Sequence, residues 1–291
     1  MSDYSIKDLE KLSGIKAHTI RIWEKRYNLV SPKRTATNIR YYSDEDLKKL
    51  LNISILNRNG VKISRIASLN NDQLHSQVNS VAREKWTHES QIESLIVAMI
   101  DLDEKRFDKL LSKNIIQMGF EDTILKVIYP FFQRIGLLWQ TGNINPAQEH
   151  FVSNLVRQKI IVAIDSIISE DHPERLKFIL FLPEGELHEL ALLFMYYLIK
   201  KRGHKVIYLG QSVPVNDVRD VQDLIGADYL ITYFTSSIPI NELNGRVENL
   251  SKTFHDTRVW IAGSQTDVLD QISQSNIKRI SSPQELISNI S

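Results

Sequence analysis

The fold is decided by one stretch, Lys177 to Gly210, which has the sequence KFILFLPEGELHELALLFMYYLIKKRGHKVIYLG. Its first six residues are almost entirely apolar, which is typical of a strand covered on both faces. Pro183 and Gly185 end that strand. Residues 187–202 are apolar nearly all round and predict a buried helix, and residues 204–209 predict a second strand. The stretch therefore predicts one βαβ unit.

The same alternation continues to the end of the chain. Further strands are predicted at residues 229–234, 258–261 and 277–280. Further helices are predicted at residues 215–225, 239–254, 265–274 and 283–290. Five strands that alternate with five helices predict a doubly wound parallel sheet with right-handed crossovers. The first strand is not followed by a Gly-x-Gly-x-x-Gly motif and the sequence has no Walker motif, so nucleotide binding is poorly supported.

His188 is the first candidate site residue, because it follows the first strand of this sheet. Ligands of open α/β sheets bind at the carboxyl ends of the strands. On position alone, a surface or capping histidine is an equally good interpretation. Ser236-Ser237 follows one later strand and Ala262-Gly263 follows the next, so these residues share the sheet edge of His188.

Composition limits the class of protein. A chain of 291 residues predicts two or three domains, and the absence of cysteine excludes disulfides, thiolate metal sites and cysteine nucleophiles. No apolar run approaches the roughly 20 residues of a membrane span. The amino terminus has neither the basic nor the apolar region of a signal peptide. We therefore expect a cytoplasmic protein without a membrane partner.

The formal net charge of +1 conceals an asymmetry. Residues 1–70 contain 14 Lys and Arg against 7 Asp and Glu, whereas the rest of the chain contains 22 against 28. A basic amino-terminal domain on an acidic body indicates a polyanionic partner for that domain.

The basic domain has the pattern of a winged helix-turn-helix. Apolar residues at helical spacing after Ser5, a glycine at 14 and a second short helix at 17–27 give helix, turn and helix. Ser31 to Arg34 and Asn38 to Tyr42 predict a small wing. The second helix would enter the major groove of DNA, with phosphate contacts from the wing. The candidate DNA-binding residues are His18, Thr19, Arg21, Lys25, Arg26, Tyr27, Arg34, Arg40 and Tyr41. Trp23 is predicted to belong to the core.

A helical region separates the basic domain from the sheet. Amphipathic segments at residues 91–102, 105–118, 123–139 and 146–169 predict a four-helix bundle. The predicted domains are a winged helix at 1–72, a polar linker at 73–88, the bundle at 89–170 and the sheet at 171–291. The predicted fold is thus multi-domain, α followed by α/β.

The basic domain closely resembles the MerR family of transcriptional regulators. The motifs that carry the resemblance are YSI at 4–6, SGI at 13–15, TIRIWEKRY at 19–27, SPKR at 31–34 and RYYS at 40–43. They extend over about 70 residues with very few departures. The resemblance implies binding to double-stranded operator DNA.

The carboxyl-terminal domain resembles the flavodoxin-like cobalamin-binding fold, in which an Asp-x-His-x-x-Gly motif supplies the lower cobalt ligand. Here the motif is Glu186, His188 and Ala191, with an acid one methylene longer and alanine in place of glycine. The resemblance implies that His188 ligates cobalt and that Glu186 orients its imidazole. The other cofactor-binding residues that it implies are Gly210, Ser236, Ser237, Ala262 and Gly263.

A second pattern in the bundle narrows the resemblance. Trp139 is followed after nine residues by Glu149-His150. Taken alone, these residues would be a core tryptophan and a helix-start acid. Ahead of a cobalamin fold, they resemble the light-responsive MerR-type repressors of carotenoid genes that bind adenosylcobalamin. The resemblance implies that Trp139 and Glu149 lie at the upper ligand and that His150 can become the upper cobalt ligand after illumination.

The sequence therefore predicts a transcriptional repressor, not an enzyme, that is controlled by adenosylcobalamin or another cobalamin. By resemblance, the protein assembles in the dark as a dimer or tetramer on its operator, and light releases it. Two alternatives stay open. One is a regulator without cofactor that is controlled by a protein partner, and the other is a cobalamin sensor without photochemistry.

Overall fold

The computed structural model describes residues 4–35, 37–84, 88–139, 145–168, 175–269 and 274–290. The chain divides into two compact units, Met1–Leu155 and Val156–Ser291. Across the described ranges, every helix is too short or too polar to cross a bilayer.

The first unit begins with helices and a two-stranded wing. Its elements are α1 (Ile6–Ser13), α2 (Ala17–Tyr27), β1 (Lys33–Arg34), β2 (Arg40–Tyr41), α3 (Asp44–Arg58), α4 (Ile63–Ala67) and α5 (Asn71–Glu84). The two strands pair antiparallel, and a bridge between Tyr4 and Tyr42 lies beside them. The predicted helix-turn-helix and wing are confirmed, as is the buried position of Trp23.

Local capping explains where these helices begin and end. The Ser5 hydroxyl accepts from the Asp8 amide while Asp8 accepts from the Ser5 amide, and Ser43 forms the same capping box with Asp46 at α3. Gly14 ends α1 with a φ of +68°, which a residue with a side chain rarely adopts. These caps fix the turn between α1 and α2.

The segment 73–88, expected as a linker, lies largely within α5. This helix packs on α3 and buries Leu74 and Val78, which are four residues apart and share one helix face. Residues 85–87 are outside the described part. The domain boundaries at 72 and 89 remain predictions.

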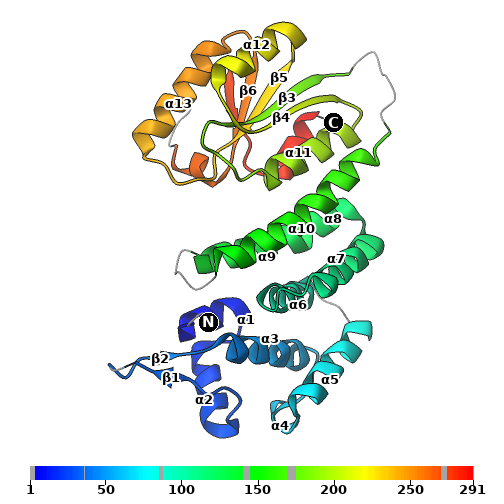
Figure 1. Ribbon diagram of the computed structural model, residues 1–291, viewed down its shortest axis with the longest axis vertical. Helices are drawn as coiled ribbons and strands as arrows, with labels where there is room; N and C mark the ends of the chain where they lie inside the picture. The colour runs from blue at the N-terminus through cyan, green and yellow to red at the C-terminus, as the bar shows by residue number, and fades with distance from the viewer. Residues whose placement is uncertain are drawn as a thin grey trace. The chain divides into compact units, whose positions relative to one another are not determined.

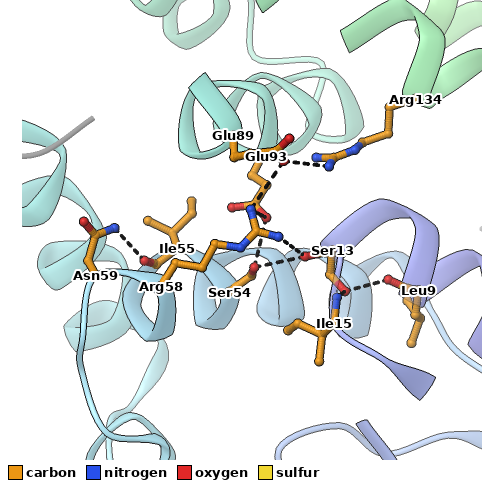
Figure 2. A network of polar contacts seen from close by, with 10 residues as sticks. All are labelled: Leu9, Ser13, Ile15, Ser54, Ile55, Arg58, Asn59, Glu89, Glu93 and Arg134. Atoms are coloured by element: carbon orange, nitrogen blue, oxygen red, sulfur yellow. Dashed lines mark hydrogen bonds and ion pairs between the residues drawn. The ribbon is translucent and has the colours of Figure 1, made fainter. Parts of the chain in front are cut away.

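The remaining helices of the first unit correspond to the predicted bundle segments. They are α6 (His88–Ile100), α7 (Glu104–Met118), α8 (Phe120–Thr123), the π-helix η1 (Ile124–Ile128), α9 (Tyr129–Trp139) and α10 (Pro146–Asp165), which continues into the second unit. Helix α6 packs on α7, on α9 and on α3, and a polar network joins α3 to α6 (Figure 2). The winged helix and the bundle as far as the middle of α10 therefore share one compact unit.

The second unit is a five-stranded parallel sheet with the strand order β4-β3-β5-β6-β7. The strands are β3 (Lys177–Pro183), β4 (Lys205–Val213), β5 (Tyr229–Tyr233), β6 (Arg258–Ala262) and β7 (Ile277–Arg279). The helices are α11 (Leu190–Lys201), α12 (Val215–Ile225), α13 (Ile240–Thr253), the short 3-10 helix η2 (Ser264–Val268) and α14 (Pro283–Ile290). The doubly wound sheet predicted from the sequence is confirmed.

Helices cover both faces of this sheet. Figure 1 shows α12 and α13 on one face, and α11 with the carboxyl-terminal helix on the other. Side chains of α12 and α13 such as Val218 and Leu243 join the strands in one buried cluster with Ile179 and Phe181. Burial on both faces explains why β3 is a continuous apolar run.

Three elements that follow α10 have bounds that differ from the prediction by three residues or more. Helix α11 begins at Leu190 instead of residue 187, because the preceding residues form a loop at the end of β3. Strand β4 continues to Val213 instead of ending at residue 209, so Gly210 lies within the strand. The helix expected at 265–274 is a short 3-10 helix up to Val268, and residues 270–273 are outside the described part.

Candidate functional site

The face of α2 predicted to meet DNA is accessible. His18, Arg21, Lys25 and Arg26 are exposed, while Thr19 and Tyr27 are half-buried. The Arg26 guanidinium lies over the Tyr27 ring, 5.5 Å from its centroid. Buried Ile20 and Trp23 hold the opposite side of the helix against the core. The arrangement presents a cationic helix surface, as major-groove binding requires.

The wing is tied to α2 by one glutamate. Glu24 Oε1 pairs with Arg40 Nε at 3.2 Å, and Glu24 Oε2 accepts from the Tyr42 hydroxyl at 3.4 Å. Arg34 Nη1 donates to Asn38 Oδ1 at 2.5 Å, while Tyr41 is half-buried in β2. Glu24 therefore offsets part of the charge of Arg40, a group that the sequence assigns to phosphate contacts.

Ile22 is an exposed residue of the predicted DNA-binding helix that the sequence reasoning did not select. Its side chain is 53% exposed in the middle of α2, between the exposed Arg21 and Lys25. An apolar side chain on such a surface suits contact with a thymine methyl group. The spacing could have revealed it, because position 22 lies one helical turn beyond His18 and therefore on the same face of the helix.

The bundle residues of the resemblance lie at the end of α9 and the start of α10. Trp139 is the last residue of α9, and its side chain lies outside the described part. Glu149 Oε2 pairs with His150 Nδ1 at 3.0 Å, and Ser153 Oγ donates to Glu149 Oε1 at 2.5 Å. The His150 side chain is 70% exposed. The neighbouring Glu149 thus holds one nitrogen of an accessible imidazole.

His188 lies in the loop that joins β3 to α11. The Glu186 amide donates to the Pro183 carbonyl at 2.9 Å across a tight turn, in which Gly185 has a φ of +85°. Such a turn favours glycine at its third position. The turn places Glu186 inside the protein and leaves the His188 side chain 47% exposed.

Glu186 is the organising residue of this loop, although it is only 4% exposed. Its Oε1 accepts from His188 Nδ1 at 2.6 Å and from the amides of Leu187 and His188 at 3.0 and 3.1 Å. Its Oε2 accepts from the amides of Thr235 and Ser236 at 2.8 and 2.7 Å, and Ser236 Oγ donates to Oε1 at 3.0 Å. One carboxylate therefore ties the end of β3 to the end of β5.

These donors decide the ionisation of Glu186. Burial by itself would raise the pKa of the carboxyl group. The hydrogen bond from His188 and those from the backbone amides of Ser236, His188 and Thr235 outweigh burial and hold the pKa well below its usual range. An ionised carboxylate accepts only, so His188 Nδ1 carries the proton. Nε2 is then the nitrogen with a lone pair for a metal.

The other predicted cofactor residues lie at the same edge of the sheet in different environments. Gly210 has a φ of +86° at a bulge of β4, and Ser237 is exposed after β5. Ala262 is fully buried in β6 and presents no side-chain surface to a ligand. At Gly263, a Cβ would lie 2.2 Å from the Phe234 carbonyl oxygen, so the loop after β6 packs directly on the end of β5.

Glu189 is a buried residue of the same loop that the sequence reasoning missed. Its Oε1 is ion-paired with Arg157 Nε of α10, and its Oε2 accepts from the Tyr208 hydroxyl of β4 at 2.7 Å. The signal was an acidic residue directly after His188 at the start of an apolar helix. His188 thus lies between two buried glutamates that reach different elements.

The donor set fits a metal that another chelator already holds. Within the described ranges, no group of three or more His, Cys, Asp or Glu side chains is placed to bind a metal ion. His188 offers one oriented imidazole, and the carboxylate behind it raises its basicity. A corrin would bring its own nitrogen ligands to cobalt, and His188 would be the donor that the protein adds.

Two family descriptions match the chain. Residues 4–72 match the MerR HTH family regulatory protein, and residues 91–163 match the B12 binding domain. The second match covers helices α6 to α10 up to residue 163. Residues 4–72 are therefore similar to the helix-turn-helix domains of MerR regulators, and residues 91–163 are similar to B12-binding domains.

Two curated proteins of Myxococcus xanthus are similar along most of this chain. The HTH-type transcriptional repressor CarH is 26% identical over 268 residues, which cover 90% of this chain and 89% of CarH. The HTH-type transcriptional repressor CarA is 25% identical over 214 residues, which cover 72% of this chain and 68% of CarA.

A solved structure has the same fold. The monomethylamine corrinoid protein of Methanosarcina barkeri matches with a TM-score of 0.55 and 14% sequence identity, covering 70% of this chain and 98% of that protein. At this identity the match shows a shared fold and no more.

Proposed function

We propose that this protein is a transcriptional repressor whose DNA binding is controlled by cobalamin. The observation that carries the proposal is the geometry of His188, whose Nδ1 is 2.6 Å from the buried and ionised Glu186. This arrangement sets the tautomer and the direction of the imidazole before any ligand binds. The likeness to CarH and CarA supports the repressor role.

In the proposed mechanism, adenosylcobalamin supplies a cobalt–carbon bond that light can break. His188 would be the protein ligand of cobalt, with Glu186 as its orienting partner. By the resemblance, Trp139 and Glu149 would hold the adenosyl group, and His150 would offer cobalt a second imidazole once light has removed that group. Since the imidazole of His150 is 70% exposed, it is accessible for that role.

On the DNA side, α2 enters the major groove and the wing contacts phosphates. Assembly in the dark joins several winged helices on one operator, and linked modules gain affinity through effective concentration. Illumination reverses the assembly and releases the operator. The acidic remainder of the chain disfavours contact with DNA outside the winged helix.

The test begins with full-length protein mixed with adenosylcobalamin in the dark, desalted, and measured by absorbance before and after green light. Corrin bands that elute with the protein and change on illumination support the photoreceptor function. Bands that elute but do not change identify a cobalamin sensor without photochemistry. If no corrin elutes with the protein, the cofactor proposal is wrong, and a regulator controlled by a protein partner becomes the better interpretation.

DNA binding is measured separately, with duplexes selected by the full-length protein from a randomised library in the dark. The selected duplex is then titrated with dark and illuminated holoprotein. Equal affinity in both states would contradict control by light, and failure to select any sequence would contradict the repressor function itself.

A further inference from the structure

The loop that carries His188 is held from both ends. Glu186 holds it to the end of β5, and Glu189 holds it to α10 and β4. The Glu189 side chain is 7% exposed, so its charge is largely removed from water. A buried carboxylate of this kind is stable only when charged or hydrogen-bonding groups satisfy it.

Both oxygens of Glu189 have a strong donor. Arg157 pairs with Oε1, and the Tyr208 hydroxyl donates to Oε2 at 2.7 Å. Burial and the adjacent Glu189 hold the pKa of Tyr208 well above its usual range, so the hydroxyl keeps its proton. The Tyr208 ring stacks on Tyr196 of α11, with 5.7 Å between centroids. The acceptor and both donors are thus fixed by packed elements.

Glu189 also fixes the start of α11. Its carbonyl accepts from the Leu193 amide at 2.8 Å, which is the first bond of that helix, and its amide donates to the Leu187 carbonyl at 3.0 Å. The backbone on either side of His188 is therefore set by one residue. A shift of Glu189 would therefore move the backbone next to His188.

Arg157 connects this loop to α10, an uninterrupted helix from Pro146 to Asp165. A residue on a stiff helix can hold its ion-pair partner in a fixed position. Arg157 is where α10 meets the loop of His188, through Glu189.

We propose that Arg157 is a positioning residue which, through Glu189, fixes the loop that carries His188 and thereby the direction of its imidazole. The imidazole expected to ligate cobalt would then be held from α10 through one ion pair. The cobalt part of this inference rests on the proposed function, whereas the part that concerns the loop does not.

The first test uses the apoprotein and hydrogen exchange of the full chain. The variant Arg157→Met removes the charge but keeps an apolar stem. The amides of Leu187 and His188, which donate to Glu186, should exchange roughly tenfold to a hundredfold faster, as expected for the loss of a charged hydrogen bond. Lys252→Met is the matched control, since Lys252 pairs with Glu248 on α13. Unchanged exchange of the two loop amides would overturn the inference, as would equal acceleration throughout the second unit.

The second test uses holoprotein prepared with adenosylcobalamin in the dark. Arg157→Met and Glu189→Gln should each retain cofactor while their visible spectra move toward that of His188→Ala. The double variant should move no further than either single one, because both act through one contact. Arg157→Lys should restore most of the spectrum. A wild-type spectrum in Arg157→Met would overturn the cobalt part. Loss of cofactor by the wild-type protein would instead refute the proposed function, and hydrogen exchange would still decide the role of Arg157.

Discussion

Ser54 of α3 and Glu93 of α6 are hydrogen-bonded between the winged helix and the bundle, with 2.9 Å from Ser54 Oγ to Glu93 Oε1 (Figure 2). Ser54 Oγ is also 3.0 Å from the Ser13 carbonyl oxygen of α1. One hydroxyl proton cannot serve two acceptors fully. If Glu93 is protonated, it donates to Ser54, and Ser54 donates to Ser13. The network is therefore complete when Glu93 carries a proton.

Burial makes that protonation accessible near neutral pH. The Glu93 side chain is fully buried, and its Oε2 has no hydrogen-bond partner among the described residues. Burial raises the pKa of Glu93 to about 7, although Arg58 and Arg134 lower it, and Glu89 raises it further. We expect a carbon-detected NMR titration of the Glu93 carboxyl group to give a midpoint near that value. A midpoint close to that of an exposed glutamate would contradict this account.

The stability of the protein should depend on pH through this group. Because the folded-state pKa is above the unfolded value, the folded protein binds more protons between about pH 4.5 and pH 7, and stability falls as the pH rises through this range. The full effect corresponds to about 3 kcal/mol. Glu93→Gln should remove this dependence in denaturant unfolding of the full chain.

Glu89→Gln is the matched control for Glu93→Gln. Burial alone would raise the pKa of Glu89, but Arg134 and Arg58 outweigh it and lower the pKa. The carboxylate of Glu89 therefore stabilises the fold at neutral pH, and this contribution is lost in acid. Glu89→Gln should lower stability at pH 7 to 8, whereas Glu93→Gln should not. If both variants changed the stability at pH 7 to 8 in the same direction, the opposite pKa shifts assigned to Glu89 and Glu93 would be wrong.

Gly263→Ala should destabilise the second unit. Gly263 has a φ of +106°, and the new Cβ would lie 2.2 Å from the Phe234 carbonyl oxygen. Backbone strain of this kind costs roughly 1–3 kcal/mol, and the clash adds to it. Gly136→Ala in α9 is the control, because nothing lies within 4 Å of its added methyl and alanine favours a helix. Thermal unfolding should show a lower midpoint for the first variant and not for the second.

The sequence predicted helices and strands correctly wherever the capping residues and the apolar pattern indicate the same element. The bounds of α2 (Ala17–Tyr27) and α12 (Val215–Ile225) were predicted to the residue. Helix α12 ends at Gly226, which takes the left-handed conformation that ends helices. In these elements, short-range chemistry decides the bounds, and a single sequence contains that chemistry.

The errors come from individual hydrogen bonds that hydrophobic periodicity does not report. The start of α11 is delayed because the amides of Leu187 and His188 bind Glu186 instead of opening a helix. The 3-10 helix η2 does not extend as an α-helix, since Arg279 donates to the Thr266 carbonyl at 3.1 Å. Before Pro130, which has no amide hydrogen, the Tyr129 amide bonds back five residues to Ile124. Such contacts depend on the folded chain.

The sequence predicted which residue types form the candidate site. It did not predict which distant residues pair with them. His188, Glu186 and Ser236 were selected from a motif, and the structure brings these three together. Glu189 was not selected, because its partner Arg157 lies 32 residues away and belongs to no motif. A pairing between distant charged residues gives no periodic signal in one sequence.

Phosphate contacts and base contacts on α2 should be separable by salt dependence. Lys25→Ala should weaken binding to all duplexes alike and reduce the slope of log affinity against log salt by about 1. Lys105→Ala, an exposed lysine of α7, should leave the slope unchanged. Fluorescence anisotropy over a salt series measures both. An unchanged slope for Lys25→Ala would exclude it from the phosphate contacts.

Ile22→Ala should change sequence preference and leave the salt slope unaltered. The side chain is 53% exposed and carries no charge, so its contribution is apolar contact with a base edge. Replacing each thymine of the selected duplex by uracil removes one methyl group at a time. At the contacted position, replacing thymine by uracil should weaken binding of the wild-type protein. The affinity of Ile22→Ala should be the same for both duplexes. If both proteins respond equally at every thymine, Ile22 contacts no thymine methyl.

Glu186→Gln should be far more harmful than its size suggests. The side chain accepts from Thr235, Ser236 and His188, and an amide nitrogen in place of one oxygen would face donors. Because the folded pKa of Glu186 is lowered, its stabilising effect is complete at neutral pH and is lost as the pH falls below the usual range of a glutamate. Leaving buried amides unsatisfied costs about 1–3 kcal/mol each. Denaturant unfolding at pH 7 should show this loss, and Glu184→Gln, at an exposed position two residues earlier, should be neutral. Equal stability of the two variants would mean that Glu186 does not hold the loop of His188.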